Sequence, residues 1–173
     1  MLVNSIKIGI AVGALAVAAV TVPDAKDPVN TGEVRLPDRI NKSSPPSLQM
    51  YKLIKQYADT FDIPLRYAFG VAYCETHYTG PFQWRYNPAQ TSHSGAEGPM
   101  QILLSTARYI NRDNVSRQTL RTDIEYNVRT GLKYLRRLHN IYGRWDLVFG
   151  YYNTGYPQVN GYARNVLNYK MKR

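Results

Sequence analysis

Apolar residues recur every three or four positions through most of the chain after residue 46, which is the spacing of helices with one buried face. In SLQMYKLIKQYADTF this spacing holds for Met50, Leu53, Ile54 and Tyr57, and Ser47 is expected to cap the helix. A second helix is predicted over PLRYAFGVAYCET, because proline suits the first turn of a helix. This part of the chain therefore begins with two helices.

The helical pattern continues after one long interruption. Residues 79–98 are rich in Gly, Ser, Pro and Asn and predict a long loop. Further helices are expected at 99–111, 122–142, 145–153 and 159–169. The longest should end at Gly143, and its buried face should contain Ile124, Val128, Leu132, Leu135 and Leu138. Because no segment alternates with a period of two, the predicted fold class is all-α, with an irregular or β-like flap in the loop.

The first 46 residues lack this pattern. Residues 8–22 form an uncharged apolar run, but as a helix they span only about 22 Å, less than the roughly 30 Å hydrocarbon core of a bilayer. We therefore expect residues 1–22 to be a signal peptide, with a retained N-terminal membrane anchor as the alternative. Residues 23–46 are rich in Pro and polar residues and predict a linker, which leaves residues 47–173 as the domain.

The charge of the chain is concentrated on the predicted domain. Among 173 residues there are 22 Lys and Arg against 12 Asp and Glu, and residues 47–173 contain 17 of the basic and 8 of the acidic side chains. This excess predicts an anionic partner. Tyrosine is abundant, with 15 residues against 4 Phe and 2 Trp, which suits a core near a polar site and surfaces that meet sugars or bases.

No metal or cofactor site is predicted. The single cysteine, Cys74, cannot form an internal disulfide, and it is expected to be a small buried residue rather than a nucleophile. His77 and His93 are near in sequence but do not have the spacing of a metal-ligand motif.

Glu75 is the candidate catalytic residue. In the second helix Leu65, Ala68, Phe69 and Ala72 form one apolar face, and the same spacing places Glu75 on it. Desolvation and the negative end of the helix dipole would both raise the pKa of such a carboxyl group, as a general acid requires. The structural alternative is an ion pair between Glu75 and a nearby arginine, Arg66 or Arg85.

The other domain carboxylates are weaker candidates. Asp59, Asp62, Asp113, Asp123, Glu125 and Asp146 occupy expected helix junctions, caps or surface positions. Glu97 lies in the loop, which we expect to be flexible, so it is not predicted to act beside Glu75. A single acid is sufficient if the attacking group comes from the substrate.

Three segments in order resemble the lytic transglycosylases of the soluble-lytic-transglycosylase (SLT, goose-lysozyme-like) family, whose fold is lysozyme-like and belongs to an α+β superfamily. AYCETHY resembles the segment with the catalytic glutamate, SGAEGPMQILLSTAR the glycine-rich methionine–glutamine block, and GYYNTGYPQVNGYARNV the tyrosine–asparagine segment. Between the last two, DIEYNVRTGLKYLRRLHNIYG resembles the long helix of the family. The similarity covers residues 48–166. Thr76 stands where serine is usual, Pro99 where leucine is frequent, and Thr154 where alanine is usual.

The resemblance implies a substrate and a set of site residues. The substrate would be peptidoglycan, cut between N-acetylmuramic acid and N-acetylglucosamine, with Glu75 as general acid and base and a 1,6-anhydro-muramoyl end as product. The residues implied to bind substrate are Thr76, Ser94, Met100, Gln101, Tyr152, Asn153 and Tyr162. Met100 and Tyr162 are also interpretable as core residues, and Asn153 as a turn residue.

Several alternatives stay open. The same fold could admit water, as in a hydrolytic goose-type lysozyme, or could serve as a wall-binding or virion structural module without turnover. The chain would be exported and act in the periplasm or at the cell wall, in secretion, conjugation or housekeeping, or else in a phage virion. Nucleic acid is not an expected partner, because no recognised basic-aromatic module is present. The basic residues Arg129, Lys133, Arg136 and Arg137 predict a solvated face that could secondarily attract acidic peptide stems and wall polymers.

Overall fold

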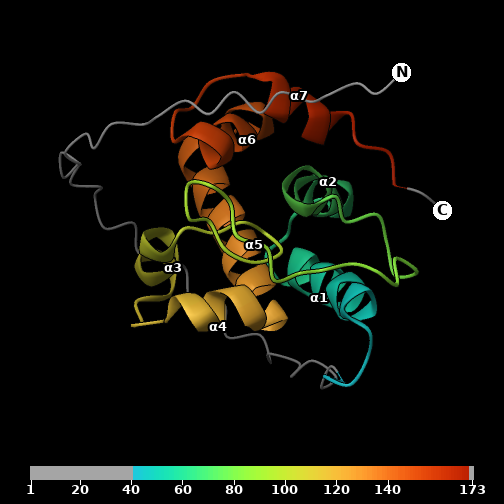
Figure 1. Cartoon of the computed structure of the whole chain (residues 1–173). Helices are drawn as coiled ribbons and strands as arrows, with labels where there is room; N and C mark the ends of the chain where they lie inside the picture. Colours follow the sequence, from blue (N-terminus) through green and yellow to red (C-terminus); the bar gives the residue numbers. More distant parts are fainter. Residues whose placement is uncertain (1–40, 172–173) are drawn as a thin grey trace. The chain divides into compact units, whose positions relative to one another are not determined.

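The computed structural model describes residues 41–171, and its helices surround the longest of them, α5 (Figure 1). The helices are α1 (Pro46–Thr60), α2 (Leu65–Thr76), α3 (Leu104–Asn111), α4 (Arg117–Thr122), α5 (Ile124–Tyr142), α6 (Trp145–Thr154) and α7 (Gly161–Leu167). Helix α5 packs against α1, α3, α4 and α6, while α2 lies between α1 and α7. This arrangement confirms the predicted all-helical fold class.

The predicted buried faces are confirmed in the two helices that form most of the core. In α1, Met50, Leu53 and Ile54 are at most 1% exposed. The apolar stripe of α5 is likewise buried, from Ile124 to Leu138. Helix α5 ends as expected at Gly143, whose φ of 68° lies in the left-handed region that glycine adopts without strain.

The predicted cap of the first helix is wrong. Helix α1 starts one residue earlier, at Pro46, and Ser47 makes no capping hydrogen bond. Its hydroxyl is buried and donates instead to the carbonyl oxygen of Pro81, while the Tyr78 hydroxyl donates to the carbonyl of Ser47. Ser47 therefore connects the start of α1 to the loop that follows α2.

The helix predicted over 99–111 begins later than expected, at Leu104. Before it, Gln101 has a φ of 48°, and the backbones of Glu97 and Ile102 pair as an antiparallel bridge. Helix α4 was not predicted; Ser116 caps it through a hydrogen bond from the Thr119 amide. The spacing rule missed this helix because six residues are too few to show a period.

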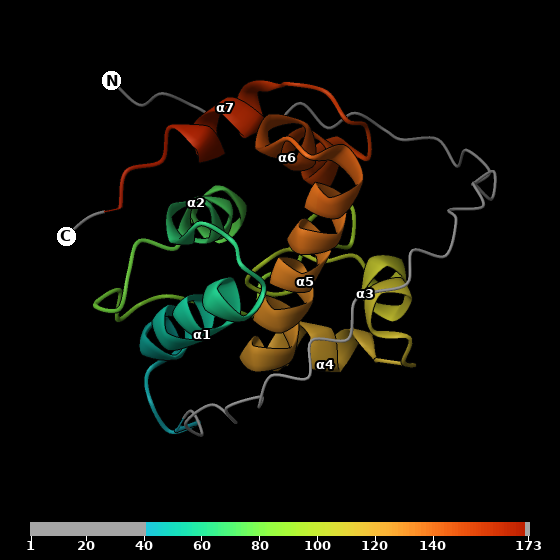
Figure 2. The same cartoon turned by 180° about the vertical axis from the view of Figure 1, so that it is seen from behind.

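Residues 77–103 form a long loop between α2 and α3, within which Thr91 and Glu97 form a second isolated antiparallel bridge. This long loop runs from the end of α2 past α1 and crosses α5 (Figure 1), and the view from behind shows it on the far side of α5 (Figure 2). No helix in residues 41–171 has the length and apolar composition of a membrane span. The predicted leader and most of the predicted linker lie outside the described residues.

Candidate active site

Glu75 lies in the last turn of α2, one residue before the helix ends at Thr76. The helix ends because His77 adopts a left-handed conformation with a φ of 56°. The side chain of Glu75 is half-buried, and its Oε1 accepts a hydrogen bond of 2.6 Å from the hydroxyl of Tyr162. A short O–H···O contact of this kind is typical of a hydroxyl bonded to a carboxylate.

Tyr162 comes from α7, at the other end of the domain sequence. Asn160 caps α7 by accepting a hydrogen bond from the Ala163 amide at 2.9 Å, which fixes the first turn and with it the position of Tyr162. Burial raises the pKa of Tyr162 well above its usual value, and the nearby charge of Glu75 raises it further. Tyr162 therefore keeps its hydroxyl proton at neutral pH and can donate it in a hydrogen bond to the carboxylate of Glu75.

Tyr152 from α6 occupies a similar environment. Its hydroxyl donates to the carbonyl oxygen of Met100 at 2.7 Å, and burial followed by the charge of Glu75 raises its pKa well above the usual value. Met100 can pack close to α5 because residue 131 is a glycine. A Cβ added at Gly131 would lie 2.8 Å from the Met100 Cβ and 3.3 Å from the Tyr152 hydroxyl. Met100 itself is fully buried.

Asn127 of α5 fixes the loop segment that carries Met100. Its side-chain oxygen accepts from the Met100 amide at 2.8 Å, and its amide group donates to the carbonyls of Glu97 and Leu120, each at 2.8 Å. Asn127 is fully buried. It lies so close to Gly98 that only glycine fits at that position: Gly98 has a φ of 74°, and an added Cβ would collide with Asn127 and the Leu120 carbonyl. We call these contacts the Asn127 clamp. The Met100 backbone is thus held at its amide by Asn127 and at its carbonyl by Tyr152.

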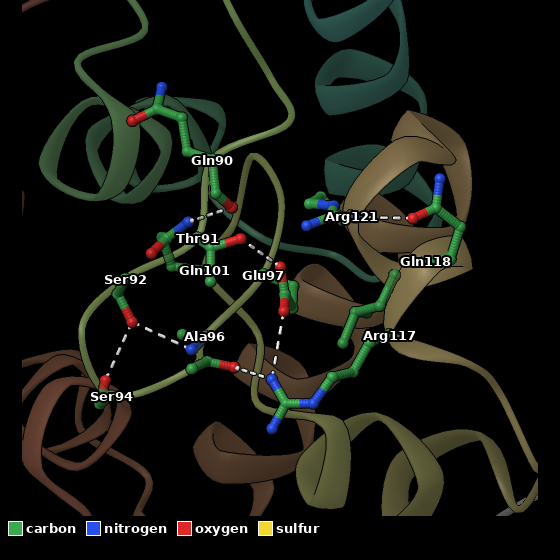
Figure 3. A network of polar contacts seen from close by, with 12 residues as sticks. Gln90, Thr91, Ser92, Ser94, Ala96, Glu97, Gln101, Arg117, Gln118 and Arg121 are labelled. Atoms are coloured by element: carbon green, nitrogen blue, oxygen red, sulfur yellow. Dashed lines mark hydrogen bonds and ion pairs between the residues drawn. The ribbon is translucent and has the colours of Figure 1, made fainter.

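Glu97 is a buried residue in a fixed network, which corrects the expectation that it lies on a flexible segment. It is 3% exposed, and its carboxylate accepts hydrogen bonds from Thr91 at 2.7 Å and from Arg117 at 3.2 Å (Figure 3). Arg117 also donates to the carbonyl of Gly95. The network therefore connects the long loop to α4.

Two of the implied substrate-binding residues, Thr76 and Gln101, use their side chains to hold the long loop. The hydroxyl of Thr76 is buried and contacts the Ala72 and Pro99 carbonyls and the Tyr86 hydroxyl. The amide nitrogen of Gln101 donates to the carbonyls of Gln90 and Gly98, and the side chain is partly exposed. Thr76 thus connects the end of α2 to the long loop, and Gln101 stabilises the turn that contains Met100.

Two others lie at the surface. Ser94 is exposed and hydrogen-bonds Ser92 at 3.0 Å (Figure 3). Asn153 is exposed at the end of α6 and accepts from Asn160 at 3.3 Å. The structure therefore brings Glu75, Tyr162, Tyr152 and Met100 into one group, with Thr76 and Gln101 beside it in sequence.

Other potential sites in residues 41–171 do not coincide with this group. No cluster of three or more His, Cys, Asp or Glu side chains in this range could hold a metal ion. Burial and the charge of Glu75 raise the pKa of Cys74 to about 11, which disfavours the thiolate that a nucleophile needs. Two cavities, of about 310 and 360 Å³, are lined by other residues of the domain.

Sequence reasoning missed Asn127 and underestimated Glu97. Asn127 lies within the apolar stripe of α5, and a polar residue in such a register is itself a signal, because a buried amide must be hydrogen-bonded. Glu97 lies between two small residues of a glycine-rich segment, where sequence spacing does not show whether a side chain points inward.

Fold and site together define a helical, lysozyme-like domain with a glutamate at the end of one helix and tyrosines from two others beside it. The Transglycosylase SLT domain family matches residues 52–173. The chain belongs to this family. No curated protein matches it significantly.

Solved structures of larger proteins are similar to this domain. The 70-kDa soluble lytic transglycosylase of Escherichia coli is 27% identical to this chain, with a TM-score of 0.52. The match covers 66% of this chain and 18% of the Escherichia coli chain. A 70-kDa soluble lytic transglycosylase in complex with bulgecin A gives the same values. An inactive mutant of the lytic transglycosylase Slt of Pseudomonas aeruginosa, 24% identical with a TM-score of 0.50 over 65% and 17%, shares the fold. This chain thus spans less than a fifth of these proteins.

Proposed function

We propose that this chain is a peptidoglycan lytic transglycosylase, which cleaves the bond between N-acetylmuramic acid and N-acetylglucosamine and leaves a 1,6-anhydro-muramoyl end. The observation that carries the proposal is the contact between Glu75 and Tyr162, made by residues 87 positions apart in an SLT family domain. A carboxyl group with a fixed orientation and restricted access to water is what proton transfer to a glycosidic oxygen requires.

In the proposed reaction Glu75 acts twice. As a carboxylic acid it donates its proton to the glycosidic oxygen while the bond from that oxygen to the anomeric carbon of the muramoyl unit breaks. As a carboxylate it then accepts the proton of the C6 hydroxyl of the same unit, whose oxygen bonds to the anomeric carbon. The proton balance closes without net use of water, so one carboxyl group is sufficient.

The surrounding residues would orient this chemistry. Tyr162 holds one oxygen of Glu75 and so fixes the plane of the carboxyl group, and Tyr152 holds the turn of Met100 and Gln101 next to it. The side-chain oxygen of Gln101 offers an acceptor for N-acetyl or hydroxyl groups of the glycan, since its amide nitrogen already donates to two carbonyls. We propose the same binding role for Ser94 and Asn153, while the buried hydroxyl of Thr76 supports it through the packing of α2.

The proposed location follows from the substrate. An enzyme that cleaves peptidoglycan acts outside the cytoplasm, so we propose export to the periplasm or cell wall, with residues 1–22 as the signal peptide or anchor. Roles in secretion, conjugation or virion assembly are consistent with this location. The strong positive charge of the chain suits a wall with acidic peptides and polymers.

Product analysis tests the proposal. Purified sacculi are incubated with the protein, and the released muropeptides are analysed by mass spectrometry before and after borohydride reduction. Anhydro ends, which do not take up hydrogen, are expected. Reducing ends would instead identify a hydrolytic goose-type lysozyme, and an absence of soluble products would identify a binding module. Glu75→Gln keeps the shape of the side chain but removes the acid, and products that persist in this variant would refute the mechanism.

A further inference from the structure

Three exposed basic residues form a line on the surface of α5. Arg129, Lys133 and Arg137 are exposed and spaced four residues apart. At 1.5 Å per residue, successive side chains are separated by about 6 Å along the helix, and the line extends over about 12 Å. We call these three residues the cationic stripe.

The cationic stripe lies on the side of α5 opposite to the candidate active site. Gly131 faces Met100 and Tyr152, and Arg129 and Lys133 are each two residues from Gly131, which places them about 200° around the helix. A ligand bound to the stripe therefore does not occupy the site of Glu75.

The surroundings of the cationic stripe add positive charge. Helix α3 packs beside this part of α5 and contributes Arg108. Helix α3 and residues 126–142 of α5 contain no acidic side chain. The nearest carboxylates are those of Glu125, one turn before Arg129, and Asp113, which accept hydrogen bonds from Tyr57 and Tyr126. The three ion pairs described within residues 41–171 involve none of the stripe residues.

Arg136 shows what a structural arginine of the same helix does. It was grouped with the stripe by sequence spacing, but its guanidinium donates to the carbonyl of Phe61 and pairs with Asp62 at 2.8 Å, so it fastens α5 to the end of α1. The two arginines of the stripe instead lie against aromatic rings: Arg129 is over Tyr126, and Arg137 is over Tyr109 and donates to its hydroxyl. These rings support the side chains and leave their charge at the surface.

We propose that the cationic stripe is a second binding surface, which holds the carboxylate-bearing peptide stems of peptidoglycan while the site of Glu75 cleaves glycan elsewhere on the domain. The inference rests on the proposed function for the identity of the ligand. Guanidinium and ammonium groups about one helical turn apart match carboxylates repeated along a polymer. The stripe is a single convex helix surface, whereas nucleic acid recognition modules combine basic residues with a groove-reading element or a stacking platform.

The experiment compares two triple variants of the full chain with equal loss of charge. Arg129→Gln, Lys133→Gln and Arg137→Gln remove the stripe, and Lys42→Gln, Lys52→Gln and Lys55→Gln remove three exposed charges at and before α1. Binding is measured by sedimentation with purified sacculi in 50 mM and 500 mM salt, and with sacculi whose peptide stems an amidase has removed. All three proteins also carry Glu75→Gln so that the sacculi stay intact.

The stripe variant is expected to bind intact sacculi about tenfold more weakly than the parent at low salt, because three charge contacts are lost. The lysine variant should bind with an affinity within about twofold of the parent's. The difference should disappear in 500 mM salt and on stripped glycan. Equal binding by the two triple variants, or a difference that persists on stripped glycan, would overturn the inference, as would stripe-dependent binding to duplex DNA that is tighter than to sacculi. With Glu75 intact, the stripe variant should cleave stripped glycan at the parent rate. A parent that releases no product would refute the proposed function and leave the binding result to be judged alone.

Discussion

Glu75 and Glu97 are two glutamates of one small domain, and the protein surrounds them differently. Glu97 is almost fully buried, between the hydroxyl of Thr91 and the guanidinium of Arg117. Glu75 is half-buried at the end of α2 and bonds the hydroxyl of Tyr162, with Tyr152 close enough for the charge of Glu75 to affect its pKa. Glu97 belongs to the region where the long loop meets α4 and α5, and Glu75 to the region where α2 meets α6 and α7.

The difference separates a structural carboxylate from one suited to chemistry. The carboxylate of Glu97 accepts hydrogen bonds from Thr91 and Arg117 and so has a structural role, because it connects the long loop to α4. A tyrosine hydroxyl orients a carboxyl group but brings no full positive charge, so the group keeps the capacity to change its protonation state. The accessibility of Glu75 to a substrate is the second difference, since Glu97 is covered.

The largest expected effect tests whether Glu75 is the catalytic carboxyl group. We expect Glu75→Gln to lower the rate of glycan cleavage by about 10²- to 10⁴-fold, the range for loss of a general acid–base, with little change in stability. The measurement is the release of soluble muropeptides from sacculi, with thermal unfolding as the folding control.

Glu97→Gln is the matched variant. It should keep the cleavage rate within about tenfold and lower the free energy of unfolding by about 1–2 kcal/mol, because one charged hydrogen bond is lost while Arg117 remains largely accessible to water. If well-folded Glu97→Gln lost most of its cleavage activity while Glu75→Gln stayed active, the catalytic carboxylate would be Glu97 and not Glu75.

The second expected effect is on the Asn127 clamp, which belongs to the Glu97 region. Asn127→Ala leaves the Met100 amide and the Glu97 and Leu120 carbonyls without their partner in a buried place. We expect a loss of about 3 kcal/mol in the free energy of unfolding, measured by urea denaturation. Asn140→Ala, at an exposed position of the same helix, is the control and should change stability by less than about 0.5 kcal/mol.

The third effect concerns pH and a tyrosine near the end of α2. Burial raises the pKa of Tyr86 to about 12 from an ordinary 10.0. The folded state thus keeps a proton that the unfolded state loses, so the stabilisation is complete below pH 10 and is lost as the pH rises to 12, by about 2 kcal/mol. Urea denaturation at pH 9 to 12 should show a smaller decline in Tyr86→Phe than in the parent. The exposed Tyr156, changed to Phe, should leave the decline unchanged.

The spacing of apolar residues was sufficient to predict the fold class and the buried faces of α1 and α5, because the apolar residues of an amphipathic helix recur every three or four positions in the sequence. It failed where a contact distant in sequence decides. Ser47 was expected to cap α1, but its hydroxyl has a partner in Pro81, 34 residues away. The segment before Leu104 was expected to be helical, but the bridge between Glu97 and Ile102 and the clamp by Asn127 hold it as a turn.

The candidate site divides in the same way. The apolar face of α2 led to Glu75 without any tertiary information, and the resemblance to a family supplied Tyr162 and Tyr152. Spacing alone does not predict that the Tyr162 hydroxyl meets Glu75 or that Tyr152 bonds the Met100 carbonyl, because each contact joins elements far apart in the chain. The separation of Arg136 from the cationic stripe likewise depends on the position of Asp62.

The smallest expected effect comes from removing the hydrogen bond that Tyr162 donates to Glu75. Tyr162→Phe removes the hydroxyl and keeps the ring, so the carboxyl group loses its fixed orientation but not its surroundings. We expect kcat to fall about tenfold, the equivalent of one hydrogen bond to a charged group, with KM nearly unchanged. Because the lost hydrogen bond favours the carboxylate form, the pKa of Glu75 should rise, and the alkaline limb of the pH–rate profile, where the general acid loses its proton, should move to higher pH. A structural role alone would lower stability without moving this limb. Tyr169→Phe, whose ring packs against Tyr73, is the control and should leave the limb in place. Equal profiles for the two variants would show that Tyr162 does not position Glu75.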